Sequence, residues 1–411
     1  METLTFSQKN HNFQIHDQTS AQEAENLVQL AKYEPLTDGG VRTSHLLSQA
    51  LSIVPDHHEA LVLQERLHQM LVPRWHFPML ADKVRNRAYA KAIEAKVMPG
   101  DVVLDIGCGA GLTAMLAARA GAKHVYTCEQ QPLIAQAAVR VIAENGLSDR
   151  ITVIPKLSHN LVVGVDIPEP ADVVISEIVD TVLLGEGALA TLTHAMSNLA
   201  KPQARAIPER GTLMAQLVES EKLLDLWRPQ KAEGFNLSAF HRFANVAQMT
   251  PNDFATFRLR PLGPSTDLFE FDFTKPNMQS AKTEQNLTCS ASGTIHAVFV
   301  SFEMELAPGI LLTNDLNSQG HWGRTAFLLD QPEAVMAGSR LKMIAQHDAS
   351  QLSVSILETI PSNDAFDQMS TWMKQPLDFP QNLTEVQDLP SLTGSNYYHV
   401  KINDNFQNLT N

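Results

Sequence analysis

The sequence predicts an α/β fold: a parallel sheet covered by helices on both faces, preceded by a helical segment and followed by an antiparallel domain. From about Pro99 to Pro208, short apolar segments alternate with helical ones, which is the rhythm of βαβ units. After Pro208 the pattern becomes strand-like alternation, for example with Phe269, Phe271 and Phe273 on one face. The second half is therefore expected to be barrel-like or sandwich-like.

Before the parallel sheet, residues 20 to 70 are predicted to be helical because apolar residues recur at helical spacing. Ala50, Leu51, Pro55 and Ala60 resemble the junction of two tetratricopeptide repeats, with Pro55 ending a helix. One repeat cannot form a solenoid. Two interpretations therefore stay open: an extension packed on the next domain, or a module that docks a partner.

The bulk composition limits the possible partners and location. Forty-five acidic residues against 31 basic ones give a net charge of −14, which disfavours nucleic acid and attracts basic ligands and peptides. Three cysteines have neither the density of a disulfide framework nor the spacing of a metal site. No signal peptide or membrane-spanning stretch is evident, so we expect a cytoplasmic protein with no metal.

A glycine-rich turn follows the first strand of the predicted sheet. VLDIGCGAGL places Gly107, Gly109 and Gly111 between a strand and a helix, where the backbone must turn sharply and let a ligand approach. Glu129 ends the next strand, 24 residues after Asp105, where a carboxylate can accept the hydroxyls of a ribose. This pattern resembles motif I of S-adenosylmethionine-dependent methyltransferases and implies that cofactor.

Two glutamates stand nine positions apart in SEIVDTVLLGEG. Glu177 is expected at the carboxyl end of a strand, and Glu186 follows a loop just before a helix. Two carboxylates facing one cavity repel each other unless a cation lies between them. A guanidinium is planar, always positive near neutral pH, and matches carboxylates with paired donors. Taken singly, each glutamate has an ordinary structural explanation, as a solvated strand end or a helix N-terminal charge.

These residues resemble the double-glutamate loop of protein arginine methyltransferases. The resemblance runs over roughly residues 75 to 358 and is nearest to two branches: the monomethylating branch and the symmetric-dimethylating branch that carries tetratricopeptide repeats. Asp180 is the diagnostic substrate-site position, because the asymmetric-dimethylating branch usually has glycine there. The resemblance thus implies monomethyl- or symmetric dimethylarginine as the product.

The same resemblance implies roles for two other motifs, MLADKVRN and GHWGR. Asp82 would pair with His321 as part of the catalytic group, and Arg85 would hold the methionyl carboxylate of the cofactor. Trp322 would line the arginine tunnel, and Met79 would influence how many methyl groups fit.

At the position where many members accept the adenine amino group with a glutamate, this chain reads KLSHNL. Asn160 or a backbone group would do so here, and Ser158 is assigned to the same cofactor site. The family architecture implies a Rossmann-like methyltransferase domain and a β-barrel domain carrying a helical dimerisation arm at about residues 222–246. The expected divisions are a TPR-like extension 1–70, the cofactor domain 71–208, the substrate domain 209–378 and a polar tail 379–411.

The sequence therefore predicts an arginine N-methyltransferase that acts on a protein or peptide, forms a homodimer, and has a possible partner site on its N-terminal helices. Two alternatives stay open: a methyltransferase for a small guanidino metabolite or peptide natural product, and an inactive scaffold of the same fold. Nucleic-acid methylation is disfavoured by the charge and by the lack of an Asn-Pro-Pro-like turn.

Overall fold

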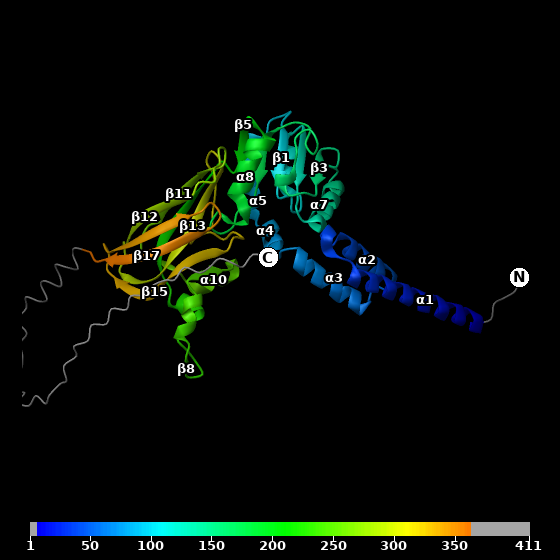
Figure 1. Cartoon of the computed structure of the whole chain (residues 1–411), viewed down its shortest axis with the longest axis horizontal. Coiled ribbons are helices and arrows are strands. Elements are labelled where there is room, and N and C mark those ends of the chain that lie inside the picture. The colour runs from blue at the N-terminus through cyan, green and yellow to red at the C-terminus, as the bar shows by residue number, and fades with distance from the viewer. Residues whose placement is uncertain (1–5, 363–411) are drawn as a thin grey trace, which may run out of the picture. The chain divides into compact units, whose positions relative to one another are not determined.

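The computed structural model describes residues 6–362 and begins with three helices in succession (Figure 1). These are α1 Phe6–Tyr33, α2 Val41–Ile53 and α3 His58–Leu71, with the 3₁₀ turn η1 Leu36–Asp38 between the first two. A small apolar core joins them and includes Val28, Leu47 and Ala60, all at 0% exposure. Pro55 lies between α2 and α3, as predicted. The predicted tail, 379–411, lies outside the described residues.

Two short helices lead from this extension into the parallel sheet. They are α4 His76–Ala81 and α5 Lys83–Lys96, and they meet at Asp82. Asp82 caps α5, since its carboxylate accepts hydrogen bonds from the backbone N–H groups of Val84 and Arg85. The segment MLADKVRN thus forms a helix–cap–helix corner.

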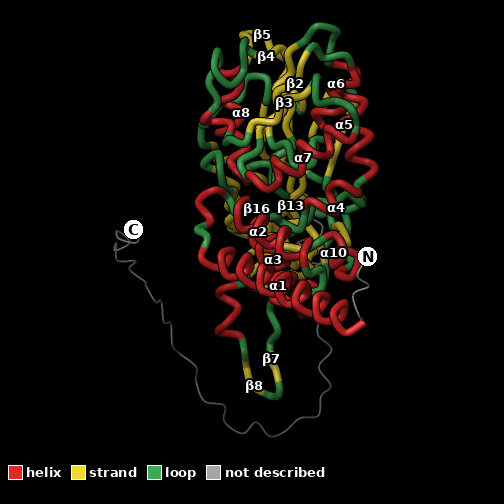
Figure 2. Tube along the Cα trace, turned by 90° about the vertical axis from the view of Figure 1, so that its right-hand side faces the viewer, coloured by secondary structure: helices red, strands yellow, loops and turns green. Residues whose placement is uncertain are grey.

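The predicted parallel sheet has five strands in the order β3-β2-β1-β4-β5, and every neighbouring pair is parallel. The strands are β1 Val102–Ile106, β2 His124–Cys128, β3 Ile151–Ile154, β4 Ala171–Ser176 and β5 Ala200–Ile207. The helices are α6 Leu112–Ala120, α7 Pro132–Glu144 and α8 Ala188–His194. Figure 2 shows α5 and α6 on one side of these strands and α8 on the other. The sheet is covered on both faces, which is why β1 is buried throughout.

After β5 the chain forms two antiparallel sheets, as the alternating pattern predicted. One has the order β10-β6-β13-β15-β9, with β11 beside β6 and β14 beside β13; the other is β12-β16-β17. The strands are β6 Arg210–Glu219, β9 Val246–Met249, β10 Arg260–Pro261, β11 Thr266–Asp272, β12 Ala281–Thr288, β13 Gly293–Ala307, β14 Ile310–Thr313, β15 Arg324–Val335, β16 Arg340–His347 and β17 Leu352–Ile360. Phe269, Phe271 and Phe273 all point into the core.

Between β6 and β9 an arm leaves the sheets (Figure 1, Figure 2). It contains α9 Glu221–Trp227, the hairpin β7 Lys231–Ala232 and β8 Phe235–Asn236, and the 3₁₀ helix η5 Ser238–Phe243; α10 Pro251–Phe257 follows β9. Leu223 anchors the base of the arm at 0% exposure, whereas Phe235, Phe240 and Phe243 are more than 70% exposed. Large exposed apolar groups on a projecting segment are typical of an interface.

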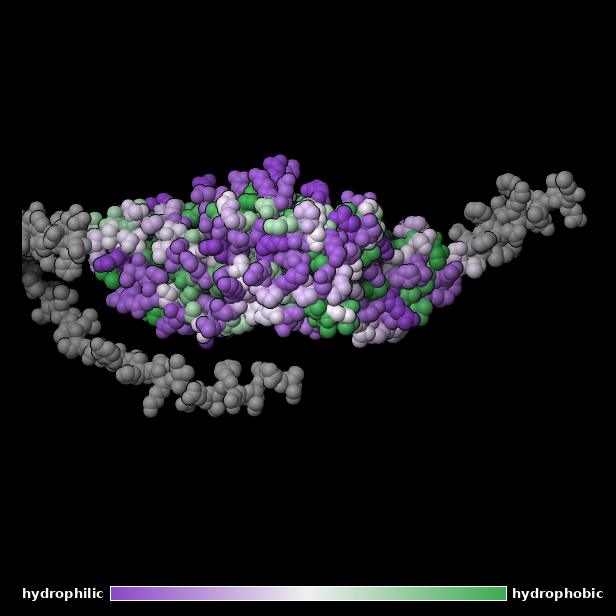
Figure 3. All heavy atoms as spheres, turned by 90° about the horizontal axis from the view of Figure 1, so that it is seen from above, coloured by the Kyte–Doolittle hydropathy of each residue, from purple (hydrophilic) through white to green (hydrophobic). Residues whose placement is uncertain are grey.

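Some details of the surface and interior differ from expectation or add to it. His347, which has no local sequence feature of a core residue, is buried against the rings of Phe269 and Phe271. The three cysteines are buried and unpaired. Hydrophilic residues predominate on the face shown in Figure 3, and within 6–362 no helix is long and apolar enough to cross a membrane. No cluster of candidate metal ligands occurs in that range either.

Candidate active site

A cavity of 610 Å³ lies at the carboxyl ends of the parallel strands. Its walls come from three parts of the sequence: the α3–α4 junction with α5, the glycine turn with the ends of β2 and β3, and the segment after β4. The lining residues that carry the argument are Leu71, Trp75, His76, Met79, Arg85, Gly107, Gly109, Glu129, Gln131, Ser158, Glu177 and Glu186.

The glycine turn requires glycine for two physical reasons. Gly107, Gly109 and Gly111 all have positive φ, a conformation that other residues adopt at a cost. In addition, a Cβ atom at Gly107 would lie 2.8 Å from the side chain of Ile178. Gly107 and Gly109 line the cavity, whereas Gly111 caps α6 just behind them.

The two carboxylates near this turn occupy different layers. Glu129 lines the cavity and accepts hydrogen bonds from the backbone N–H groups of Gly109 (3.1 Å) and Gln131 (2.9 Å). Asp105 does not line the cavity; it lies beneath the turn, 1% exposed, and accepts a hydrogen bond from Thr127. Burial raises the pKa of Asp105 to about 6, although hydrogen bonds from Thr127 and Thr113 oppose the shift. Its position therefore supports the turn from below.

The two candidates for the adenine end are separated by the structure. Ser158 lines the cavity, is buried, and its hydroxyl has no hydrogen-bond partner within the described range. Asn160 is exposed and does not line the cavity, because the 3₁₀ turn η2 (Ser158–Asn160) directs it outward. Of the two, only Ser158 is placed to contact a ligand there.

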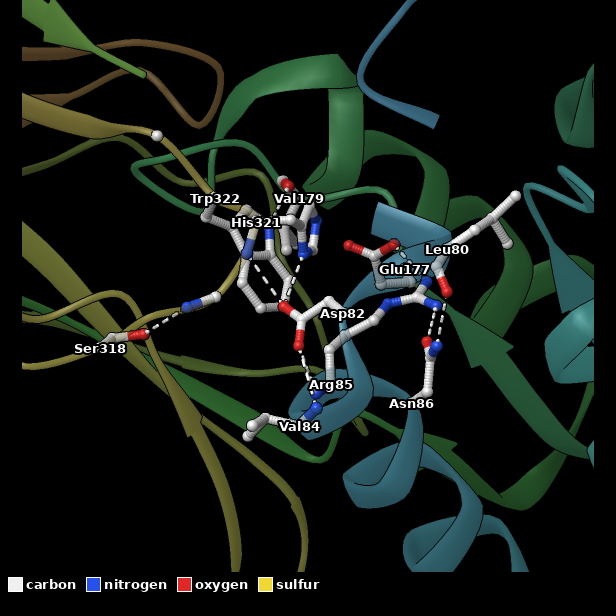
Figure 4. A network of polar contacts seen from close by, with 12 residues as sticks. Leu80, Asp82, Val84, Arg85, Asn86, Glu177, Val179, Ser318, His321 and Trp322 are labelled. Atoms are coloured by element: carbon white, nitrogen blue, oxygen red, sulfur yellow. Dashed lines mark hydrogen bonds and ion pairs between the residues drawn. The ribbon is translucent and has the colours of Figure 1, made fainter. Parts of the chain in front are cut away.

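Glu177 directly follows β4 and is almost completely buried, with a side chain 6% exposed. One of its carboxylate oxygens accepts a hydrogen bond of 2.5 Å from Arg85 Nη2, as Figure 4 shows. Burial raises the pKa of Glu177 to about 7 against the lowering effect of the Arg85 guanidinium. The carboxylate thus already holds one guanidinium group, contributed by the protein itself.

Glu186 reaches the same cavity from a strained turn. It has φ +58° although it is not glycine, and it belongs to the 3₁₀ turn η3 (Gly185–Gly187) just before α8. Burial and then the nearby charge of Asp180 raise its pKa. Left-handed backbone at a non-glycine residue costs free energy and is typical of functional sites. The two glutamates therefore share one cavity, as the sequence predicted.

Asp180 does not line the cavity but shapes the loop between the glutamates. Its side chain lies so close to Gly185 that a Cβ atom there would be 2.3 Å from Asp180 Oδ2 and 2.8 Å from Asp180 Cβ. Asp180 also accepts a hydrogen bond from the backbone N–H of Val182. This residue and Gly185 fit together as a pair.

Asp82 and His321 meet beside Arg85 (Figure 4). Asp82 Oδ2 lies 3.1 Å from His321 Nδ1 and accepts a hydrogen bond of 2.9 Å from the His321 backbone N–H. Burial lowers the pKa of His321, and the Asp82 hydrogen bond opposes this. A Cβ atom at Gly320 would lie 3.1 Å from Asp82 Oδ2, a tight contact that the carboxylate would have to relieve by a small shift.

Of the other two residues predicted to contact the substrate, one lines the cavity and the other does not. Met79 lines the cavity. Trp322 does not line it: the indole is buried, donates to Val179 O at 3.3 Å and meets the ring of Phe302 edge-on. In this structure Trp322 packs behind residues 177–186, here called the carboxylate loop, and supports this loop.

Part of the cavity wall is formed by residues that no sequence motif indicated. Trp75 and His76 stack with 4.0 Å between ring centroids, and His76 Cδ2 lies 3.9 Å from where a Cβ atom of Gly109 would be. Leu71, at the end of α3, and Gln131 also line the cavity. Only the aromatic pair just before MLAD gave a local signal, since the other two reach the cavity through tertiary packing.

Comparisons with known proteins agree with this geometry. A family profile described as "Arginine methyltransferase oligomerization subdomain" matches residues 209–358, and one described as "Ribosomal protein L11 methyltransferase (PrmA)" matches residues 88–217. A curated "Arginine N(omega)-methyltransferase" from Streptomyces achromogenes subsp. streptozoticus is 41% identical over 286 residues, covering 69% of this chain and 79% of that protein.

The chain belongs to the arginine N-methyltransferase family. It is also 32% identical to "Protein arginine N-methyltransferase 7" of Rattus norvegicus, over 72% of this chain but only about half of that longer protein (48%). Of the two branches that the sequence resembles, the monomethylating one fits these relatives.

Solved structures share the fold. The Trypanosoma brucei PRMT1 enzyme-prozyme heterotetrameric complex with AdoHcy matches with a TM-score of 0.60 and 25% identity, covering 68% of this chain and 91% of that chain. Arabidopsis thaliana protein arginine methyltransferase 10 matches with a TM-score of 0.55 and 20% identity, covering 69% and 96%. The Rossmann-like domain followed by an antiparallel domain is thereby confirmed.

Proposed function

We propose that the chain transfers a methyl group from S-adenosylmethionine to a terminal nitrogen of an arginine guanidinium. The observation that carries this proposal is the placement of Glu177 and Glu186 on one cavity together with the glycine turn. A guanidinium offers paired donors to both carboxylates and offsets their repulsion. Arg85 already demonstrates this complementarity by its hydrogen bond to Glu177.

The polar groups of the cavity fit S-adenosylmethionine. Arg85 Nε and Ser158 Oγ are buried and have no hydrogen-bond partner within the described residues, so both are available to a ligand. Arg85 would hold the methionyl carboxylate, Ser158 the adenine edge, and Glu129 the ribose hydroxyls, since a carboxylate retains acceptor capacity beyond two hydrogen bonds. When bound, this cofactor supplies an electrophilic methyl group on a sulfonium.

The two glutamates and the Asp82–His321 pair have different roles in the proposed reaction. Glu177 and Glu186 orient the guanidinium and hold its positive charge away from the attacking nitrogen. The pair Asp82–His321 orients the substrate or takes up the released proton. Because the pKa of a guanidinium exceeds about 12, proton loss accompanies or follows methyl transfer, and no early base is required.

The test is the substitution Glu186→Gln, measured by arginine methylation and by calorimetric binding of S-adenosylhomocysteine. We expect methylation to fall about 100-fold or more while the Kd of S-adenosylhomocysteine stays within about twofold, because only the substrate clamp is lost. Glu94→Gln is the matched control, since Glu94 is an exposed residue of α5 that does not line the cavity. Normal turnover in Glu186→Gln would contradict the proposal.

Two substrate classes are proposed for this site. A protein or peptide arginine is the first, with monomethyl- or symmetric dimethylarginine as the product. Free arginine or another small guanidino compound is the second, and the relative named as an arginine N(omega)-methyltransferase, which shares 41% identity, favours it. Tandem mass spectrometry after incubation with an arginine-rich peptide or with free L-arginine separates the two and reads out the product.

The proposed assembly is a homodimer formed through the arm, supported by the exposed Phe235, Phe240 and Phe243 and by the oligomerization profile over 209–358. The N-terminal helices are proposed as a partner site, supported by Tyr33 at 84% exposure. The free cysteines support the predicted cytoplasmic location, which stays a proposal.

A further inference from the structure

Arg324, the first residue of β15, is a guanidinium buried at 1% exposure. Its donors reach four backbone carbonyls of the preceding loop, residues 315–323. Nε donates to Asp315 O at 3.3 Å, Nη2 to Ser318 O at 2.7 Å, and Nη1 to Trp322 O and to Gly323 O, the latter at 3.2 Å. A single side chain thus ties the two ends and the middle of this loop together.

This cation has no ion-pair partner within 6–362. The guanidinium lies over the ring of Phe254, with 4.9 Å between the guanidinium carbon and the ring centroid. Burial lowers the pKa of Arg324, as expected for a charge removed from water, and the charge of the Asp315 carboxylate opposes this. Burying a cation costs free energy unless its hydrogen bonds hold a backbone segment that an apolar residue could not hold.

The 315–323 loop, which Arg324 holds, contacts both Asp82 at the start of α5 and the carboxylate loop. His321 on this loop pairs with Asp82 at the start of α5. Trp322 Nε1 donates to Val179 O, and Thr325 Oγ1 lies 2.7 Å from Thr181 Oγ1, so the same region contacts the carboxylate loop twice.

A buried asparagine completes the connection. Asn314, at 0% exposure, donates to Thr181 O at 3.0 Å and to Gly323 O at 3.4 Å, and its own oxygen accepts from the backbone N–H of Phe302. One polar network therefore holds the 315–323 loop and the carboxylate loop together. On the 315–323 loop, the guanidinium of Arg324 donates to four backbone carbonyls.

We propose that Arg324 is a positioning residue for the reaction proposed above: it fixes the 315–323 loop so that His321 stays on Asp82 and the carboxylate loop keeps its place. Lysine carries the same charge but one nitrogen, which cannot reach carbonyls spread over nine residues. The fork geometry, and not only the charge, is what the site requires.

The test compares Arg324→Lys and Arg324→Gln with the wild type. A displacement of about 1 Å in catalytic groups costs on the order of 100-fold in rate, so we expect kcat to fall about 10- to 100-fold in both variants. The Kd of S-adenosylhomocysteine should stay within about twofold, because Arg324 does not line the cavity.

The pKa of His321, followed by NMR and assigned with His321→Gln, separates charge from geometry. The charged groups acting on His321 are Asp82 and Arg85 from the α5 side and Arg324 from β15. In Arg324→Lys the charge is kept but His321 leaves Asp82, whose hydrogen bond raises the histidine pKa, so the pKa of His321 should fall. In Arg324→Gln the positive charge that lowers this pKa is lost as well, so the pKa of His321 should lie above its value in Arg324→Lys.

Arg150→Gln is the matched control, since Arg150 donates to two backbone carbonyls, those of Ala118 and Ala122, outside the cavity. Phe254→Leu is a milder variant that removes only the aromatic face, with an expected kcat loss of about 2- to 10-fold. Unchanged kcat in Arg324→Gln, or an equal loss in Arg150→Gln, would overturn the proposal. If the wild type methylates no arginine, the proposed function fails, whereas the His321 titration still tests the role of Arg324.

Discussion

Glu177 and Glu186 share one cavity but differ in burial and neighbours. Glu177 is nearly inaccessible and touches Arg85, whereas Glu186 is more accessible to solvent and is held by a left-handed turn beside Asp180. A buried carboxyl titrates at higher pH because ionisation in a poorly solvated site is unfavourable. The ionisation of Glu177, with its pKa of about 7, is therefore expected to control substrate binding near neutral pH.

The first prediction is an acidic limb in kcat/KM with an apparent pKa near 7. Below that pH Glu177 is protonated and cannot bind a cation, so kcat/KM rises as pH increases through 7. A bound guanidinium stabilises the ionised form, so the corresponding limb in kcat should lie at lower pH. Steady-state kinetics over about three pH units around that pKa measure both limbs. A limb that disappears in His321→Gln would assign it to the histidine instead.

The second prediction concerns the contact of Asp180 with Gly185. Gly185→Ala should displace Asp180 and the adjacent Glu186, and lower methylation about 10- to 100-fold with little change in cofactor affinity. Removing the obstructing side chain with Asp180→Gly in the same chain should restore part of the activity. A double-mutant cycle with the three variants measures this coupling, and purely additive losses would show that the two sites are independent.

At the scale of elements, the N-terminal extension is part of the cavity and not only an appendage. Leu71 at the end of α3 lines the cavity, and the turn before α2 packs on the start of α7. A Cβ atom at Gly39 would lie 2.5 Å from Pro132 Cδ and 2.9 Å from Gln131 Oε1. Since Gln131 lines the cavity, a shift of these helices is expected to move this part of the cavity wall.

The third prediction is that Gly39→Ala weakens cofactor binding. Strain and overlap at this turn are expected to push on Gln131 and raise the Kd of S-adenosylhomocysteine about 3- to 30-fold, a cost of roughly 0.7–2 kcal/mol. Gly146→Ala is a closely matched control, because both glycines have φ +69° but nothing lies within 4 Å of a Cβ atom at Gly146. Equal Kd values for the two variants would mean that the extension does not influence the cofactor site.

At the scale of the molecule, the arm presents apolar surface that nothing in the described chain covers. Phe240 and Phe243 contact each other edge-on with 5.3 Å between ring centroids, and both are 72% exposed. Exposing such groups to water is unfavourable, and association buries them.

The fourth prediction is that the wild type sediments as a dimer, whereas the double variant Phe240→Glu, Phe243→Glu is a monomer, because charges on both rings oppose burial. Analytical ultracentrifugation measures this. Val165→Glu serves as the control, since Val165 is 79% exposed but belongs to the cofactor domain. A wild type that remains monomeric at high concentration would exclude the proposed arm interface.

Local patterns predicted much of this protein. The βαβ rhythm, the switch to antiparallel strands and the glycine turn are recorded in neighbouring residues, and so is the spacing of Glu177 and Glu186. Burial could not be read in this way. His347 has no local feature that distinguishes it from a surface histidine, and Asn160 is directed outward by a turn only two residues from the buried Ser158.

The sequence by itself determined the fold class, the family and the residue types of the site, because periodicity and motif spacing are properties of short segments. The tertiary structure alone decided which side chains meet across long separations. It placed the Arg85 guanidinium on Glu177, and Gly39 beside Gln131 of the cavity wall. It also placed the Arg324 guanidinium on a loop that reaches Asp82. These contacts join residues far apart in the chain, and only the packing of elements fixes the distance between them.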